Sequence, residues 1–86
     1  MQQISERDFK VIELQCLYMM RPHCKVRKCL TGALIENIQD LNLPETLEVD
    51  LLAKVIVAER GKPDTRRELL NRVLDLIEAW IEVLDE

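Results

Sequence analysis

The stretch that most constrains the fold is residues 47–58, LEVDLLAKVIVA. If it is helical, its apolar side chains cover well over half of the helix circumference; they are Leu47, Leu51, Leu52, Val55, Ile56, Val57 and Ala58. A surface helix of a small protein needs an apolar stripe only about 100° wide. This helix is therefore expected to contact partners on more than one side.

The composition indicates one small helical domain over residues 1–86. The chain is 48% hydrophobic but only 3% aromatic, is 33% charged and has two glycines. A net charge of −4 disfavours nonspecific binding to nucleic acid or to acidic membranes. The three cysteines form no paired framework, and no segment resembles a signal peptide or a membrane span. These features favour the cytoplasm.

Proline and capping residues divide the first half of the chain into two helices. Ser5 is placed to cap a helix by accepting from the amide of Asp8, and this helix is expected to run to about residue 20. Pro22 ends it and suits the opening of a second helix, from 22 to about 41.

Two further helices are expected in the second half. Asn42 can cap the third helix, which has Pro44 in its first turn and ends near Arg60. Gly61 suits the left-handed backbone conformation that often ends a helix, here the third. Pro63 then opens a fourth helix that runs to about residue 84.

Short linkers make successive helices antiparallel neighbours, which predicts two helical hairpins at about 5–41 and 44–84. The two copies lie about 39–40 residues apart. In each, the first helix is apolar on more than one face and the second carries a single stripe. This alternation favours an all-α helical repeat array over a plain four-helix bundle, which remains the alternative.

No motif for catalysis or metal binding is apparent. His23 and Cys24 are adjacent and diverge on a helix, and Cys24 and Cys29 do not share a helix face. A zinc site or a Cys–His nucleophile is therefore disfavoured, and packing is the expected role of the thiols. The sequence has no glycine-rich phosphate loop and no paired carboxylates in an apolar setting. We expect a protein that is not an enzyme and uses no cofactor or metal.

The surplus apolar surface of the first and third helices predicts a groove for an amphipathic helix. The groove candidates are Leu14, Leu17, Tyr18, Leu51, Val55 and Ile56. A second contact or self-association is expected at Phe9, Trp80, Ile81 and Leu84.

Charge is expected to separate between the ends of the molecule. Basic residues surround both hairpin corners; they are Arg21, Lys25, Arg27, Lys28, Arg60, Lys62, Arg66 and Arg67. Acidic residues gather at the opposite end; they are Glu45, Glu48, Asp50, Glu82, Asp85 and Glu86. Of the basic set, Arg21, Lys25, Arg60 and Arg66 are the candidates for electrostatic contact with a partner.

Residues 12–61 resemble the tetratricopeptide-like chaperones that hold the needle subunit of bacterial type III secretion systems. The resemblance is carried by Ile12-Glu13-Leu14, an HC corner at His23-Cys24, Cys29 in the following helix, Leu51-Leu52, and an RG corner at Arg60-Gly61. The repeat offset exceeds the usual roughly 34 residues and leaves room for two hairpins.

This resemblance implies that the two hairpins form a tetratricopeptide-like right-handed array. It also implies a cytoplasmic, non-catalytic chaperone with a role in virulence. Family members clasp the amphipathic C-terminal helix of the needle subunit in a concave groove and prevent premature polymerisation. A second small helical co-chaperone packs on the N-terminal helices, which gives a heterotrimer. The same features leave two alternatives open: a small dimeric regulator that binds DNA or a transcription factor through its basic corners, and a helix-bundle enzyme subunit without chemistry of its own.

Overall fold

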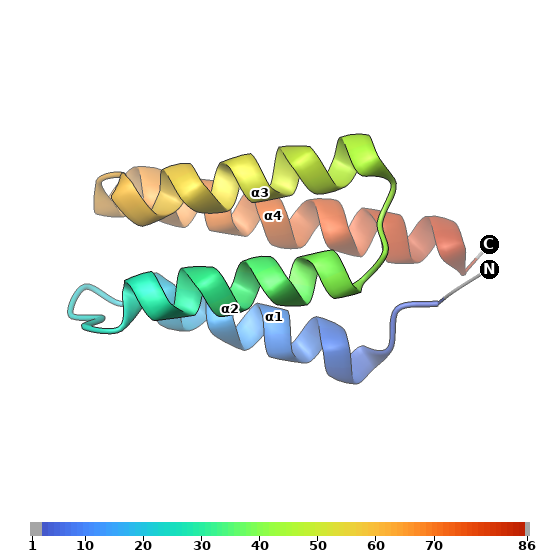
Figure 1. The fold of residues 1–86 in the computed structure, drawn as a ribbon, viewed down its shortest axis with the longest axis horizontal. Coiled ribbons are helices and arrows are strands. Elements are labelled where there is room, and N and C mark those ends of the chain that lie inside the picture. The colour runs from blue at the N-terminus through green and yellow to red at the C-terminus, as the bar shows by residue number, and fades with distance from the viewer. Residues whose placement is uncertain (1–2, 86) are drawn as a thin grey trace.

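The computed structural model describes residues 3–85 and contains four helices. They are α1 (Glu6–Met19), α2 (Arg27–Asp40), α3 (Glu45–Arg60) and α4 (Pro63–Leu84), and no strand is present in this range. The helices run antiparallel in two hairpins, with both hairpin corners at one end and the α2–α3 linker at the other (Figure 1). The predicted all-α fold with two hairpins is confirmed.

The two hairpins close into a four-helix bundle. Each helix packs against two neighbours, so that α1 contacts α2 and α4, while α3 contacts α2 and α4. Figure 1 shows α2 and α3 in front of α1 and α4, which places α1 and α3 at opposite corners of the bundle. In the expected tetratricopeptide-like array, the first helices of the two hairpins would lie side by side. The structure differs because α4 occupies that place beside α1.

The core repeats at an offset of 39 residues. The fully buried positions of the first hairpin have fully buried counterparts in the second: Ile12 and Leu51, Cys16 and Val55, Met19 and Ala58, Leu34 and Val73, and Ile38 and Ile77. Both hairpins therefore contribute equivalent faces to a single core. The internal repeat expected from the sequence is present as a repeat of buried positions.

Helix starts follow the capping residues in part. The Ser5 hydroxyl accepts from the Asp8 amide over 3.1 Å, and Pro63 lies in the first turn of α4, as predicted. The N-cap position of α3 is Pro44, whereas Asn42 lies just beyond α2 in the left-handed region at φ 54°. Asparagine tolerates that conformation better than most residues.

The first corner is longer than predicted. We expected α2 to begin at Pro22, but it begins at Arg27, and Val26 occupies its N-cap position without a side-chain cap. Pro22 has no amide hydrogen to continue the hydrogen bonds of α1. Residues 20–26 thus form an irregular connection, whereas residues 61–62 suffice at the second corner.

Gly61 is extended, with φ −77° and ψ 169°, so its predicted left-handed closing role is wrong. A glycine is still favoured there, because a Cβ atom would lie 3.2 Å from the carbonyl oxygen of Val57. Arg66 instead satisfies the end of α3: its Nε donates to the Ala58 carbonyl and its terminal nitrogen to the Gly61 carbonyl.

Candidate functional site

The outer face of α1 carries the most apolar side chains that no other helix covers. Leu14, Leu17 and Tyr18 lie opposite the buried positions Ile12 and Cys16 and are 53%, 48% and 45% exposed. Successive residues of a helix are separated by about 100°, which puts all three on one side. We call these three residues the α1 outer face.

The other predicted groove residues do not join this face. Leu51 and Val55 are completely buried and belong to the core, so their assignment to a partner-binding groove is wrong. Ile56 is 45% exposed but lies on α3, diagonally across the bundle from α1. The sequence shows that both helices have apolar residues on two sides, and the structure shows that one side of each is core and the other faces outward.

The internal repeat allows the two outward faces to be compared. The counterparts of Leu17 and Tyr18 are Ile56 and Val57, which are also exposed. However, the counterpart of Leu14 is Ala53, a much smaller side chain. The large exposed hydrophobic residues of α1 are Val11, Leu14, Leu17 and Tyr18; those of α3 are Val49, Ile56 and Val57. Together these are seven of the nine in the described residues, and the α1 set is the larger.

A cavity of about 440 Å³ adjoins the α1 outer face at the first corner. It is lined by Tyr18, Arg21, Pro22, His23, Cys24, Lys25 and Val26. The guanidinium of Arg21 lies over the Tyr18 ring, 4.6 Å from its centroid. The irregular connection after Pro22 creates this cavity, which the sequence did not predict because residues 22–26 were expected to be helical.

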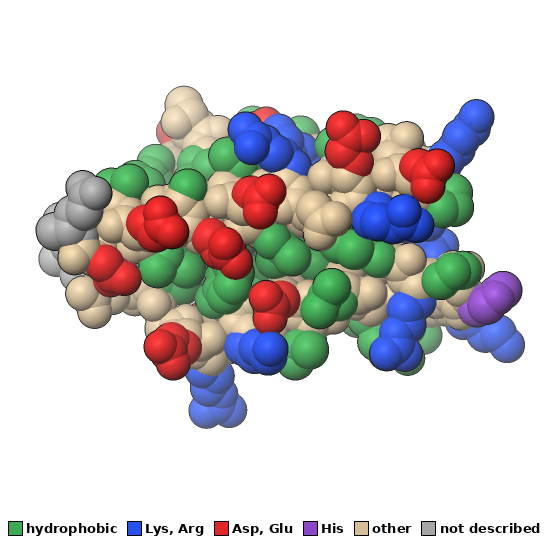
Figure 2. Space-filling view, turned by 180° about the vertical axis from the view of Figure 1, so that it is seen from behind, with side chains coloured by type: hydrophobic (Ala, Val, Ile, Leu, Met, Phe, Trp, Pro, Cys, Tyr) green, Lys and Arg blue, Asp and Glu red, His purple; other side chains and the backbone are tan. Residues whose placement is uncertain are grey.

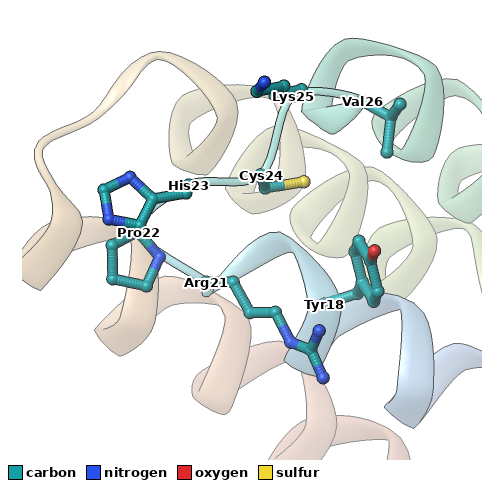
Figure 3. Close-up of a pocket in the computed structure, with 7 residues that line it drawn as sticks. All are labelled: Tyr18, Arg21, Pro22, His23, Cys24, Lys25 and Val26. Carbon is teal, nitrogen blue, oxygen red and sulfur yellow. The ribbon is translucent and has the colours of Figure 1, made fainter.

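His23 and Cys24 are not arranged as a catalytic pair. In Figure 3 the imidazole and the sulfur point in opposite directions along the loop. Cys24 is half-buried, Cys29 is exposed and Cys16 is buried in the core. Burial raises the pKa of the Cys16 thiol to about 12, with a smaller contribution from the charge of Glu13. Within residues 3–85, no group of three His, Cys, Asp or Glu residues is positioned to hold a metal ion.

Arginines secure both corners in the same way. Nε of Arg27 donates to the Met19 carbonyl over 3.2 Å, and its terminal nitrogen donates to the Arg21 carbonyl over 3.0 Å. Arg66, 39 residues later, donates in a similar way to the carbonyls of Ala58, the counterpart of Met19, and of Gly61, over 3.0 and 2.8 Å.

Only Arg66 of the predicted electrostatic residues lies inside the fold. It is 7% exposed, so it is not available to a partner, whereas Arg21, Lys25 and Arg60 are exposed. Burial and the charge of Arg27 lower the pKa of Arg66. We call the bonds of Arg27 and Arg66 to these carbonyls the arginine clamps. They were not predicted, because the sequence does not reveal that a basic side chain will bond to the end of the preceding helix.

The predicted second-contact residues lie at the end of the bundle opposite the corners. Trp80, Ile81 and Leu84 are half-buried on α4, and Phe9 is half-buried on α1. The structure brings Phe9 and Ile81 together in a groove of about 300 Å³; its other lining residues are Ile4, Ser5, Glu6, Lys10, Glu78 and Glu82. We call this the end groove.

Charge is distributed in part as the sequence predicts. The basic corner residues lie at one end, and Glu45, Glu48, Glu82 and Asp85 lie toward the other, whereas Asp50 lies further along α3. Glu86 falls outside the described range. Figure 2 shows apolar side chains along the seam between α1 and α4, flanked by carboxylates toward the end where the chain termini lie.

No helix among residues 3–85 combines the length and apolar character needed to cross a membrane. Comparisons of the chain with protein-family models, with curated proteins and with solved structures found no match.

Proposed function

We propose that this protein is a non-catalytic binding module that covers one side of an amphipathic helix. The observation that carries the proposal is the α1 outer face, where Leu14, Leu17 and Tyr18 are about half exposed and uncovered by the fold. A contiguous apolar face on a small domain is typical of a surface that binds another protein. An i, i+3, i+4 arrangement suits recognition of a second helix.

The magnitude of this surface limits what it can do alone. Burying a large apolar side chain completely contributes about 1.5–3 kcal/mol, so burying the exposed halves of three contributes roughly 3 kcal/mol. A micromolar complex needs about 8 kcal/mol in addition to the cost of association. The partner must therefore extend beyond the three residues. Val11, and Arg21 over the Tyr18 ring, flank the face and would enlarge the contact.

The specific partner that we propose is the amphipathic helix of a type III secretion needle subunit. This rests on the motif resemblance of residues 12–61. A subunit built to polymerise exposes an apolar helix, and a cytoplasmic chaperone would cover that helix until secretion. The bundle places α1 and α3 on opposite sides, so the guest helix would lie along α1 rather than between α1 and α3.

A second small helical protein belongs to the same proposal, as a co-chaperone in a heterotrimer. Co-expression with the genomic neighbours tests it. Recovery of the chain in a 1:1:1 complex with two small helical proteins supports the chaperone. A stable homodimer that shifts DNA with a steep salt dependence would refute it and favour the regulator instead.

Two exposed positions provide a matched pair for this test. Leu17→Asp alters the α1 outer face, and Ile56→Asp alters the equivalent position on α3, where the exposed fraction is nearly the same. The proposal requires that Leu17→Asp abolish recovery of the complex and that Ile56→Asp leave it intact. Equal recovery with both variants, or loss only with Ile56→Asp, would exclude the α1 outer face.

A further inference from the structure

We propose that the end groove between α1 and α4 binds a protein segment in which a large apolar side chain is flanked by lysine or arginine. This inference concerns a different surface from the α1 outer face and does not depend on the proposed chaperone function. It rests on the shape of the groove, on its charge and on a comparison with the equivalent seam between α2 and α3.

The groove has an apolar floor and an acidic rim. Phe9, Ile81 and Ile4 supply the apolar surface. Glu6, Glu78 and Glu82 are exposed at its edge, and no ion pair within residues 3–85 involves any of them. Among the described lining residues Lys10 is the one that is basic, and its amine pairs with Glu13 over 3.0 Å. The described part of the rim therefore carries net negative charge around an apolar centre.

The internal repeat allows the α1–α4 seam to be compared with an equivalent seam in the same bundle. An offset of 39 residues relates the α1–α4 seam to the α2–α3 seam, and Ile4 to Leu43. Leu43 belongs to the α2–α3 linker and is part of the core, where it is 8% exposed, whereas Ile4 is only half-buried. At the α2–α3 seam a residue of the connecting linker thus packs into the core. The α1–α4 seam keeps an opening of about 300 Å³, which is large enough for one or two apolar side chains.

Charge complementarity selects the occupant. An acidic rim around an apolar floor disfavours an acidic segment, since like charges brought together lower affinity, and favours a basic one. The interaction should weaken with salt because the rim carboxylates are exposed. A second copy of this chain offers basic residues at its corners, and binding of that kind is one outcome that the test separates from binding of a foreign segment.

The test uses a peptide of about 15 residues with Leu and Phe on one helical face and Lys on both flanks, long enough to form some helix. A twin peptide has Glu at every Lys position. Binding is followed by the ¹³C-methyl shifts of Ile81 and Ile4 in the full chain. We expect saturable shifts with the basic peptide, weaker binding at higher salt and no saturable shift with the twin. Equal binding of the two peptides would overturn the proposal.

Matched charge variants locate the site. Glu78→Gln with Glu82→Gln removes two rim charges, whereas Glu68→Gln with Asp75→Asn removes two exposed charges from α4 outside the groove lining. We expect the first pair to weaken binding about three- to tenfold and the second pair to leave it nearly unchanged. Equal weakening by both pairs would show nonspecific attraction to an acidic protein and refute the site, as would the absence of saturable binding.

Sedimentation of the protein alone tests whether a second copy of the chain occupies the end groove. The proposal expects a monomer at the concentrations used for the titration. Self-association that the Glu78→Gln, Glu82→Gln pair abolishes would show that the corner of a second copy fills the groove, and would overturn assignment to a foreign segment.

Discussion

Nε of Arg66 donates to the backbone carbonyl of Ala58 over 3.0 Å, so the first turn of α4 is bonded to the last turn of α3. Arg27 and Met19 have the same relationship at the first corner. Carbonyls at a helix C-terminus lack partners within the helix, and a guanidinium can satisfy two of them at once. Arg27 and Arg66 thus stabilise both corners, and neither corner has a residue in the left-handed backbone conformation.

Arg66→Met is expected to lower the free energy of unfolding by about 1–3 kcal/mol, because two charge-assisted bonds to backbone carbonyls are lost. Urea unfolding followed by circular dichroism measures the change. Arg67→Met is the control, since Arg67 is exposed and its ion pair with Asp64 spans 3.6 Å; it should change stability by less than about 0.5 kcal/mol. Similar effects of the two substitutions would show that the clamp contributes no stability.

Val55→Asp is expected to unfold the chain, because the carboxylate would replace a fully buried side chain and have no partner in the core. Ile56→Asp, one residue later and half exposed, should keep the helix content. Far-UV circular dichroism of both variants checks the prediction. A folded Val55→Asp variant would contradict the assignment of Val55 to the core.

Stability should fall in alkaline solution partly because of Cys16. Its pKa is raised to about 12 in the fold, whereas its ordinary value is 9.0. Above pH 9 the unfolded state loses this proton and the folded state keeps it, so unfolding becomes more favourable as the pH rises. At pH 10 the effect is about 1 kcal/mol. Urea unfolding measures the decrease in unfolding free energy between pH 7 and pH 10. This decrease should be smaller by that amount in Cys16→Ala than in the unmodified chain, and equal decreases would show that Cys16 does not cause it.

The three thiols should react with a disulfide reagent in order of exposure. Cys29 is exposed, Cys24 is half-buried and Cys16 is buried. We expect Cys29 to react first, Cys24 more slowly, and Cys16 only as the chain unfolds, since a buried neutral thiol is unreactive. Mass spectrometry of the modified peptides over time gives the order. Early modification of Cys16 would show that α1 opens readily from the bundle.

Local signals in the sequence predicted much of the fold. Ser5 and Pro63 mark helix starts through properties of their own side chains, and the spacing of apolar residues revealed two hairpins about 39–40 residues apart. Residues 22–26 departed from the prediction: Pro22 cannot donate a backbone hydrogen bond to extend α1, and α2 begins only at Arg27. Closure of the bundle depends on α1 meeting α4, and no local pattern specifies that contact.

The candidate site was only partly predictable for a related reason. Apolar periodicity measures how wide the apolar surface of a helix is, but not which side faces the core. Leu17 and Val55 look alike in sequence, yet one is exposed and the other is buried. The acidic rim of the end groove joins residues from both ends of the chain, so it emerges only from the fold.

The most direct test of the central claim is calorimetric titration of the chain with a peptide of the amphipathic C-terminal helix from a needle subunit encoded beside it. We predict saturable 1:1 binding to the unmodified chain and to Ile56→Asp, and no detectable binding to folded Leu17→Asp. No binding to the unmodified chain, or binding that Leu17→Asp leaves unchanged, would contradict the account.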